Sequence, residues 1–246
     1  MTREGPHIRL GLAWAATTVV AAAVGPVVLA LVLTPVAALA AAQAARSWRR
    51  RRRPAAWPVS AGGAGLIVIA SAFGLVGVIG AVLVIVDLLV LAEALLLSAA
   101  KRPRRRADPL LTALIAAGFG LAGAAPVLLR SEGLVPAFVL LSFVHVYDAS
   151  AYIVGSGAAA AWEGSVAGVA SIAAVTLAVA AVLSPPFRGA SPWLFGLLAA
   201  ALTPMGPLAA SELLGDRGAR VPALRRLDSL LVVGPVWALA AAVALD

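Results

Sequence analysis

The chain has 246 residues, of which 62% are hydrophobic and only 12% are charged. Soluble domains carry about twice that share of charged residues, so a water-soluble globular protein is excluded. The mean hydropathy of +1.01 is typical of a protein that crosses the membrane several times. Because the chain contains no cysteine, disulfides, thiol nucleophiles and cysteine-ligated metals are excluded as well.

The net charge of +8 is concentrated in two basic clusters that lie between apolar stretches. The first cluster contains Arg46 and residues 49–53, and the second contains Lys101, Arg102 and residues 104–106. Such clusters mark cytoplasmic loops and attract anionic lipid headgroups. We therefore interpret the charge as topological and expect membrane lipids, not nucleic acid, as partners.

Seven apolar stretches follow one another along the chain. A helix needs about 20 residues to cross a bilayer, so the first two stretches are long enough to be predicted as helical hairpins. Their turns are expected at Gly25–Pro26 and near residues 77–80. Counting each hairpin as two crossings gives about nine transmembrane helices. The stretches are residues 10–45, 65–98, 109–129, 134–153, 166–183, 192–210 and 229–245.

This count predicts an all-α fold, a helical bundle in which residues 1–246 form a single transmembrane domain. Residues 1–106 would form the hairpins with their basic loops, and residues 107–246 would carry the site. Placing both basic clusters in the cytoplasm puts the amino terminus inside and the carboxyl terminus outside the cell membrane. The same rule places residues 155–165 and 211–228 on the cytoplasmic side.

Glycine spacing predicts two places of close helix packing. Gly74, Gly77 and Gly80 are expected on one helix. Gly164 and Gly168 have the four-residue spacing that lets two helix backbones touch.

Three polar side chains share one predicted helix face within an apolar stretch. His145, Asp148 and Tyr152 follow one another at intervals of three and four residues, which stack on a helix. A charged group at bilayer depth costs a few kcal/mol, so it needs a partner or a task. The spacing leaves two interpretations open: a hydrogen-bonded trio that fixes helix packing, or a functional site.

Further acidic groups stand where two later helices are expected to begin. Glu163 can cap the dipole of its helix or reach a bound cation. Asp228 and Ser229 precede the last stretch as a second candidate cap. Arg225 and Arg226, just before them, suit a phosphate group, although a solvated topological loop explains the same arginines.

Taken in order, these segments of about the last 100 residues resemble the phosphatidate cytidylyltransferase (CDP-diacylglycerol synthase) family. Four family patterns have counterparts here. They are D-x-x-A-Y-x-x-G at Asp148, Ala151, Tyr152 and Gly155, W-E-G at residues 162–164 followed by Gly168, G-D-L-x-E-S echoed by residues 206–211, and L-D-R-x-D-S echoed by residues 224–229.

The resemblance implies transfer of a cytidylyl group from CTP to the phosphate of phosphatidic acid at the cytoplasmic membrane surface, with Mg²⁺ and release of diphosphate. The catalytic residues would be Asp148, Glu163 and Asp228, with Asp148 and Asp228 also holding the metal. The residues assigned to substrate binding are His145, Tyr152, Ser211, Arg225, Arg226 and Ser229.

The chain also departs from the family patterns at acidic positions. Pro207 and Arg225 replace two aspartates, and Ala210 replaces a glutamate. Each change removes a metal or phosphate contact, which makes Mg²⁺ binding and cytidylyl transfer doubtful. A guanidinium such as that of Arg225 can nevertheless hold a phosphate without metal.

We therefore predict a divergent member of the family that acts on or binds a phosphorylated lipid. The alternative is a non-catalytic lipid-binding or partner subunit of the same fold. A transporter with Asp87 and Asp148 along its pathway is less favoured, because the sequence shows no inverted repeat. The sequence leaves open whether the protein forms a homo-oligomer.

Overall fold

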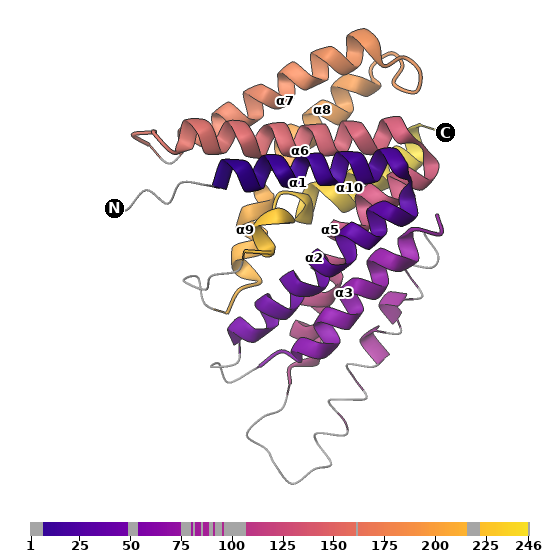
Figure 1. Ribbon diagram of the computed structural model, residues 1–246, viewed down its shortest axis with the longest axis vertical. Helices are drawn as coiled ribbons and strands as arrows, with labels where there is room; N and C mark the ends of the chain where they lie inside the picture. The colour runs from indigo at the N-terminus through magenta and orange to yellow at the C-terminus, as the bar shows by residue number, and fades with distance from the viewer. Residues whose placement is uncertain are drawn as a thin grey trace.

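The structure is a computed structural model, and every regular element that it describes is a helix, as predicted. Figure 1 shows these helices packed as a bundle. The described residues are 7–48, 54–74, 80, 82–84, 86–88, 91, 95, 107–160, 162–215 and 222–245.

The first predicted hairpin is confirmed. Helix α1 (His7–Val24) ends one residue before Gly25, and α2 (Pro26–Ser47) begins one residue after it. Proline at the first helical position lacks only an N–H that would have no partner inside the helix. The two helices meet at this turn in Figure 1, where both are drawn in indigo and violet.

The second hairpin differs from the prediction. Helix α3 (Trp57–Ser71) begins before residue 65, because Ser60 and Gly63 pack against the next long helix instead of forming a loop. It ends in a turn where Gly74 has a φ of +69°. Gly74 therefore does not share a helix with Gly80, and that prediction is wrong. Gly77 lies outside the described residues.

The remaining helices are close to the predicted stretches. They are α5 (Pro109–Glu132), α6 (Leu134–Gly155), α7 (Trp162–Val182), α8 (Ser191–Leu202), α9 (Met205–Glu212), the short 3-10 helix η3 (Leu224–Arg226) and α10 (Leu230–Ala244).

Length and composition qualify five described helical segments as membrane spans: α2, α5, α6, α7 and the combined α8–α9 segment. Three shorter apolar helices, in α1, α3 and α10, accompany them. The membrane bundle agrees with the prediction, while the count of nine spans stays a prediction.

Helix α5 packs against α2, α3, α6 and α10, and it is the most buried of the five candidate spans. In α5, 61% of the apolar span is buried, against 22% in α7. Figure 1 accordingly shows α7 and α8 together on one side of the molecule and α2 and α3 on the other.

Two hydrogen bonds join described residues that flank segments predicted to be cytoplasmic. The N–H of Asp108 donates to the carbonyl of Pro54 at 2.8 Å, which joins the chain just after each basic cluster. Trp48 Nε1 donates to the carbonyl of Leu213 at 2.9 Å, so the end of α2 contacts the last loop. A third hydrogen bond lies near the turn between α1 and α2. There Arg130 Nε of α5 donates to the carbonyl of Ala22 at 2.5 Å.

Candidate functional site

The centre of the candidate site is a contact between α6 and the start of α10. Ser229 Oγ donates a hydrogen bond to Asp148 Oδ1 at 2.5 Å, across 81 residues of sequence. Ser229 is only 2% exposed. Asp228 lies within electrostatic range of Asp148, so the fold brings together two of the three predicted catalytic carboxylates.

Two arginines from η3 add positive charge to this pair. Arg226 interacts electrostatically with both Asp148 and Asp228, and Arg225 interacts with Asp228. Arg225 is exposed, whereas Arg226 is partly buried. An Arg226 guanidinium nitrogen lies 4.0 Å from the position that a Cβ would take at Gly11 of α1. The two guanidinium groups therefore offset the charge of the two carboxylates when both are ionised.

Burial determines the protonation of Asp228, which lies between η3 and α10. It raises the pKa of this carboxyl group, and the backbone N–H of Ser229 and the Arg225 guanidinium oppose the rise. The Ser229 N–H donates to Asp228 Oδ1 at 2.9 Å. The ionised form of Asp228 is therefore less favoured than that of an exposed aspartate. A bound cation or an additional hydrogen-bond donor would stabilise the ionised form.

Helix α9 closes on the same segment through a glycine. A Cβ at Gly206 would lie 2.1 Å from the Asp228 carbonyl oxygen and 2.9 Å from Ser229 Cα, so only glycine fits here. The predicted ligand Ser211 donates to the carbonyl of Leu208 within α9 at 2.7 Å. Pro207 is exposed.

Glu163 has a different environment, at the start of α7. Its Oε1 accepts a hydrogen bond from the N–H of Ala160 at 2.8 Å, and its own N–H donates to the Ala160 carbonyl. This reciprocal pair is a helix cap, the first of the two interpretations of this residue. Among residues 7–245 as far as they are described, no three His, Asp or Glu side chains gather closely enough to hold a metal.

The three side chains predicted to share one face of α6 have separate surroundings. His145 Nε2 and Thr18 Oγ1 of α1 are 2.8 Å apart, which links two helices. Asp148 faces Ser229. Tyr152 is 43% exposed. Helix packing thus accounts for His145, while Asp148 belongs to the candidate site.

The predicted glycine contact between α6 and α7 is confirmed. A Cβ at Gly164 would lie 2.7 Å from the carbonyl oxygen of Ala151 and 3.1 Å from Gly155 Cα. At Gly168, a Cβ would lie 2.4 Å from Cδ2 of Tyr147. The two helices therefore touch, with the Tyr147 ring filling the space over Gly168.

Tyr147, which precedes Asp148 on α6, is a buried residue that the sequence reasoning missed. It is 4% exposed. Its ring packs over Gly168 of α7, and its side chain interacts electrostatically with Asp148 and Asp228. The available signal was Gly168, because a glycine at a close helix contact needs a large side chain opposite to fill the space.

The geometry can be compared with known proteins. A family model described as the cytidylyltransferase family matches residues 7–244. The chain belongs to the cytidylyltransferase family. The match covers nearly the whole chain, including the amino-terminal helices, whereas the sequence patterns lie in about the last 100 residues. A search of curated proteins and a search of solved structures gave no match.

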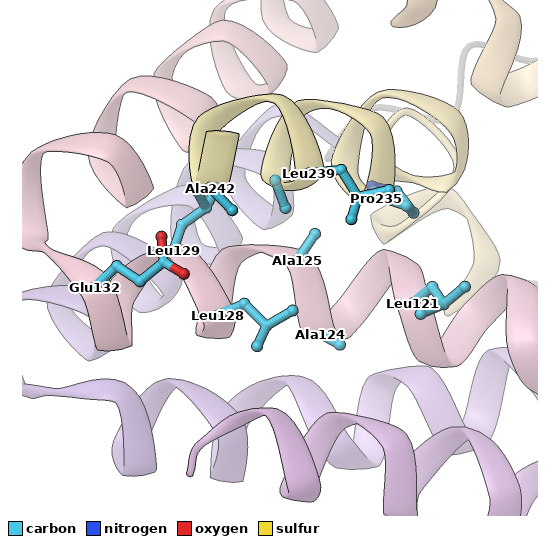
Figure 2. A pocket seen from close by; sticks show the side chains of 10 residues that line it. Leu121, Ala124, Ala125, Leu128, Leu129, Glu132, Pro235, Leu239 and Ala242 are labelled. Atoms are coloured by element: carbon cyan, nitrogen blue, oxygen red, sulfur yellow. The ribbon is translucent and has the colours of Figure 1, made fainter. Parts of the chain in front are cut away.

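This cytidylyltransferase-family chain also has an apolar cavity between α5 and α10. Figure 2 shows it between the two helices, with Leu121 and Pro235 at one end and Glu132 at the other. None of the predicted site residues lines this cavity. It is therefore separate from the polar cluster, and its lining is unsuited to a nucleotide triphosphate.

Proposed function

We propose that the protein binds a phosphorylated lipid of the phosphatidic acid type at the cytoplasmic end of its membrane bundle and acts on it there. The observation that carries this proposal is the Asp148–Ser229 hydrogen bond, with Asp228 and Arg226 beside it. A guanidinium binds phosphate through paired hydrogen bonds. Arg226 can therefore hold the headgroup where the membrane helices end.

The cytoplasmic orientation in this proposal is supported by charge. The flanks of both basic clusters lie side by side through Asp108 and Pro54, and basic loops stay in the cytoplasm. CTP, a soluble nucleotide, would then reach the site from the cytoplasm.

The reaction proposed from the family is cytidylyl transfer. An oxygen of the lipid phosphate forms a bond to the α-phosphorus of CTP, and the bond from that phosphorus to the departing diphosphate breaks. Arg225 and Arg226 would neutralise the charge that develops on the leaving group. Ser229 would hold Asp148 in its present orientation.

Mg²⁺ belongs to this proposal because carboxylate oxygens are the type of donor that it binds. Mg²⁺ is commonly held by one or two carboxylates together with substrate phosphates. Asp148 and Asp228 would hold the ion, which would supply charge neutralisation along the triphosphate. Pro207 and Arg225 add no carboxylate at the positions where the family pattern has one.

A non-catalytic lipid-binding role is the second candidate. Two observations favour it: Arg225 occupies an aspartate position of the family pattern, and Glu163 is engaged as a helix cap. Both features reduce the carboxylates available for metal-dependent chemistry but leave phosphate binding by Arg226 intact.

Retention of phosphatidic acid by the purified protein in detergent tests lipid binding. We expect Arg226→Gln to weaken retention about tenfold, since a hydrogen bond to a charged group is lost. The exposed Arg188, in the loop between α7 and α8, supplies a matched control: Arg188→Gln should change retention less than about twofold. Equal retention of phosphatidic acid and uncharged diacylglycerol by the unmodified protein would refute the proposal.

Cytidylyl transfer is measured separately, with labelled CTP, phosphatidic acid and Mg²⁺. Formation of labelled CDP-diacylglycerol, abolished by Asp148→Asn, would support the catalytic candidate. Phosphatidic acid retention without any product would support the binding candidate.

A further inference from the structure

Helix α2 carries an amide side chain near its end, and this side chain contacts the segment that holds the site arginines. Gln43 is the only glutamine of the chain, and it lies between the buried residues Ala42 and Ala44. Its Oε1 accepts a hydrogen bond from the N–H of Ala223 at 3.3 Å, across 180 residues of sequence. Because a polar group in an apolar helix is costly without a partner, this contact fixes the end of α2 to the residue that precedes η3.

The backbone of Ala223 connects Gln43 with Arg226. The Ala223 N–H donates to Gln43, while the Ala223 carbonyl accepts the N–H of Arg226 at 3.2 Å. Helix α2 packs against η3, and Leu227, directly after η3, is fully buried. A 3-10 helix of three residues has too few hydrogen bonds to maintain its own conformation. The contacts with Gln43 and around Leu227 therefore determine where the backbone of Arg226 lies.

The side chain of Arg226 extends from this backbone toward α1. One guanidinium nitrogen lies 4.0 Å from the position that a Cβ would take at Gly11, and the side chain is partly buried. A guanidinium binds phosphate through paired hydrogen bonds, which require a defined orientation of its plane. A small shift of η3 would therefore weaken a phosphate contact while the helices of the bundle remain packed.

A second side chain of α2 holds the same loop at its other end. Ser47 Oγ accepts a hydrogen bond from the N–H of Gly215 at 2.9 Å. Gly215 lies well before η3, whereas Ala223 bonds directly to Arg226. The two contacts of α2 are thus alike in chemistry, and they differ in whether they reach the arginine.

We propose that Gln43 positions Arg226 for the lipid phosphate: its amide oxygen holds Ala223, and Ala223 in turn holds the arginine. This inference rests on the proposed function and gives α2, which lies outside the four sequence patterns of the family, a part in the binding site. Gln43 is a positioning residue, because it acts through the backbone of Ala223 and not by contact with the phosphate.

Deletion of the two acceptors on α2 tests this role. Gln43→Met removes the oxygen at nearly constant side-chain length, and Ser47→Ala is the matched control at the other end of the loop. Both variants are purified in detergent and assayed with dioleoyl phosphatidic acid and dioleoylglycerol. We expect Gln43→Met to weaken binding of phosphatidic acid about three- to tenfold, the equivalent of one hydrogen bond, and to leave binding of dioleoylglycerol unchanged. Ser47→Ala should change neither by more than about twofold.

A second variant and a double-mutant cycle show whether Gln43 acts through Arg226. Gln43→Asn withdraws the amide oxygen by one methylene and should weaken phosphatidic acid binding in the same direction as Gln43→Met. In the Arg226→Gln background, Gln43→Met should add less than about a twofold loss, because the group that it positions has already been removed. A further three- to tenfold loss in that background would show that the two residues act independently, and it would overturn the inference.

The outcomes separate this inference from the proposed function. If the unmodified protein prefers phosphatidic acid and both Gln43 variants preserve that preference, the role of Gln43 is overturned while the lipid-phosphate site stands. If Ser47→Ala reduces the preference as much as Gln43→Met does, general anchoring of the loop explains the effect and the inference is refuted. Equal loss of both lipids by Gln43→Met would indicate a purely structural role and would also refute it. If the unmodified protein shows no preference, the proposed function fails, and this inference fails with it.

Discussion

The starts of α7 and α10 use acidic residues in different ways. At α7, Glu163 bonds to Ala160, three residues away. At α10, Ser229 reaches Asp148, 81 residues away, and brings Asp228 with it. Both starts match family patterns, yet only the second unites distant parts of the chain. An acidic residue at a helix start therefore becomes a candidate site only where other elements close on it.

Packing explains why the two helix starts differ. At α10, Gly206 permits the backbone of α9 to touch Asp228, and Ser229 is almost fully buried. At α7, Trp162 is 65% exposed, so a neighbouring element does not cover the first residue of the helix. The Glu163 carboxylate consequently finds its partner in its own turn.

Removal of the hydrogen bond between Ser229 and Asp148 should have the largest effect on stability and on phosphatidic acid retention. Ser229→Ala deletes the donor to Asp148 and leaves a partly buried carboxylate without it. We expect the free energy of unfolding to fall by about 1–2 kcal/mol and phosphatidic acid retention to weaken. Tryptophan fluorescence during thermal unfolding in detergent measures the first effect, since the chain has six tryptophans. Unchanged stability and unchanged retention would show that the contact is incidental.

Local sequence signals predicted local features well. Gly25 with Pro26 identified the first turn, and the spacing of Gly164 and Gly168 identified a helix contact. In each case the physical cause lies within a few residues: a missing N–H or a missing side chain. By contrast, the start of α3 was misplaced, because tertiary contacts of Gly63 outweigh its weak helix propensity.

The candidate site was only partly predictable, because its contacts cross long stretches of chain. The order of the family patterns predicted that Asp148 and Asp228 would meet. It gave no sign that His145 would bind Thr18, 127 residues away, or that the Tyr147 ring would pack over Gly168 of α7. Periodicity is a weak guide here, since helices in lipid are apolar on every side.

Removal of the local contact at α7 should have a smaller effect. Glu163→Ala deletes the acceptor for the Ala160 N–H, and we expect a loss of about 0.5–1 kcal/mol in unfolding free energy. Glu163→Gln keeps a side-chain acceptor and should retain most of that stability. Phosphatidic acid retention should stay within about twofold of the unmodified protein in both variants. A large loss of retention in Glu163→Gln would place this residue in the site and break the contrast between the two helix starts.

The smallest expected effect is on the pH dependence of stability, through Asp228. Because burial raises the pKa of this carboxyl group, the folded protein binds its proton more tightly than the unfolded chain does. That contribution to stability is fully present at pH values below the unfolded pKa and is lost as the pH rises through the folded pKa. Asp228→Asn keeps an acceptor for the Ser229 N–H but does not titrate. The melting temperature of the variant relative to the unmodified protein should therefore increase as the pH rises above the ordinary range of an aspartate. A difference in melting temperature that stays constant or shrinks as the pH rises would mean that Arg225 and Arg226 already compensate for the burial of Asp228. The acidic residue at the start of α10 would then be no more destabilised than Glu163 at the start of α7.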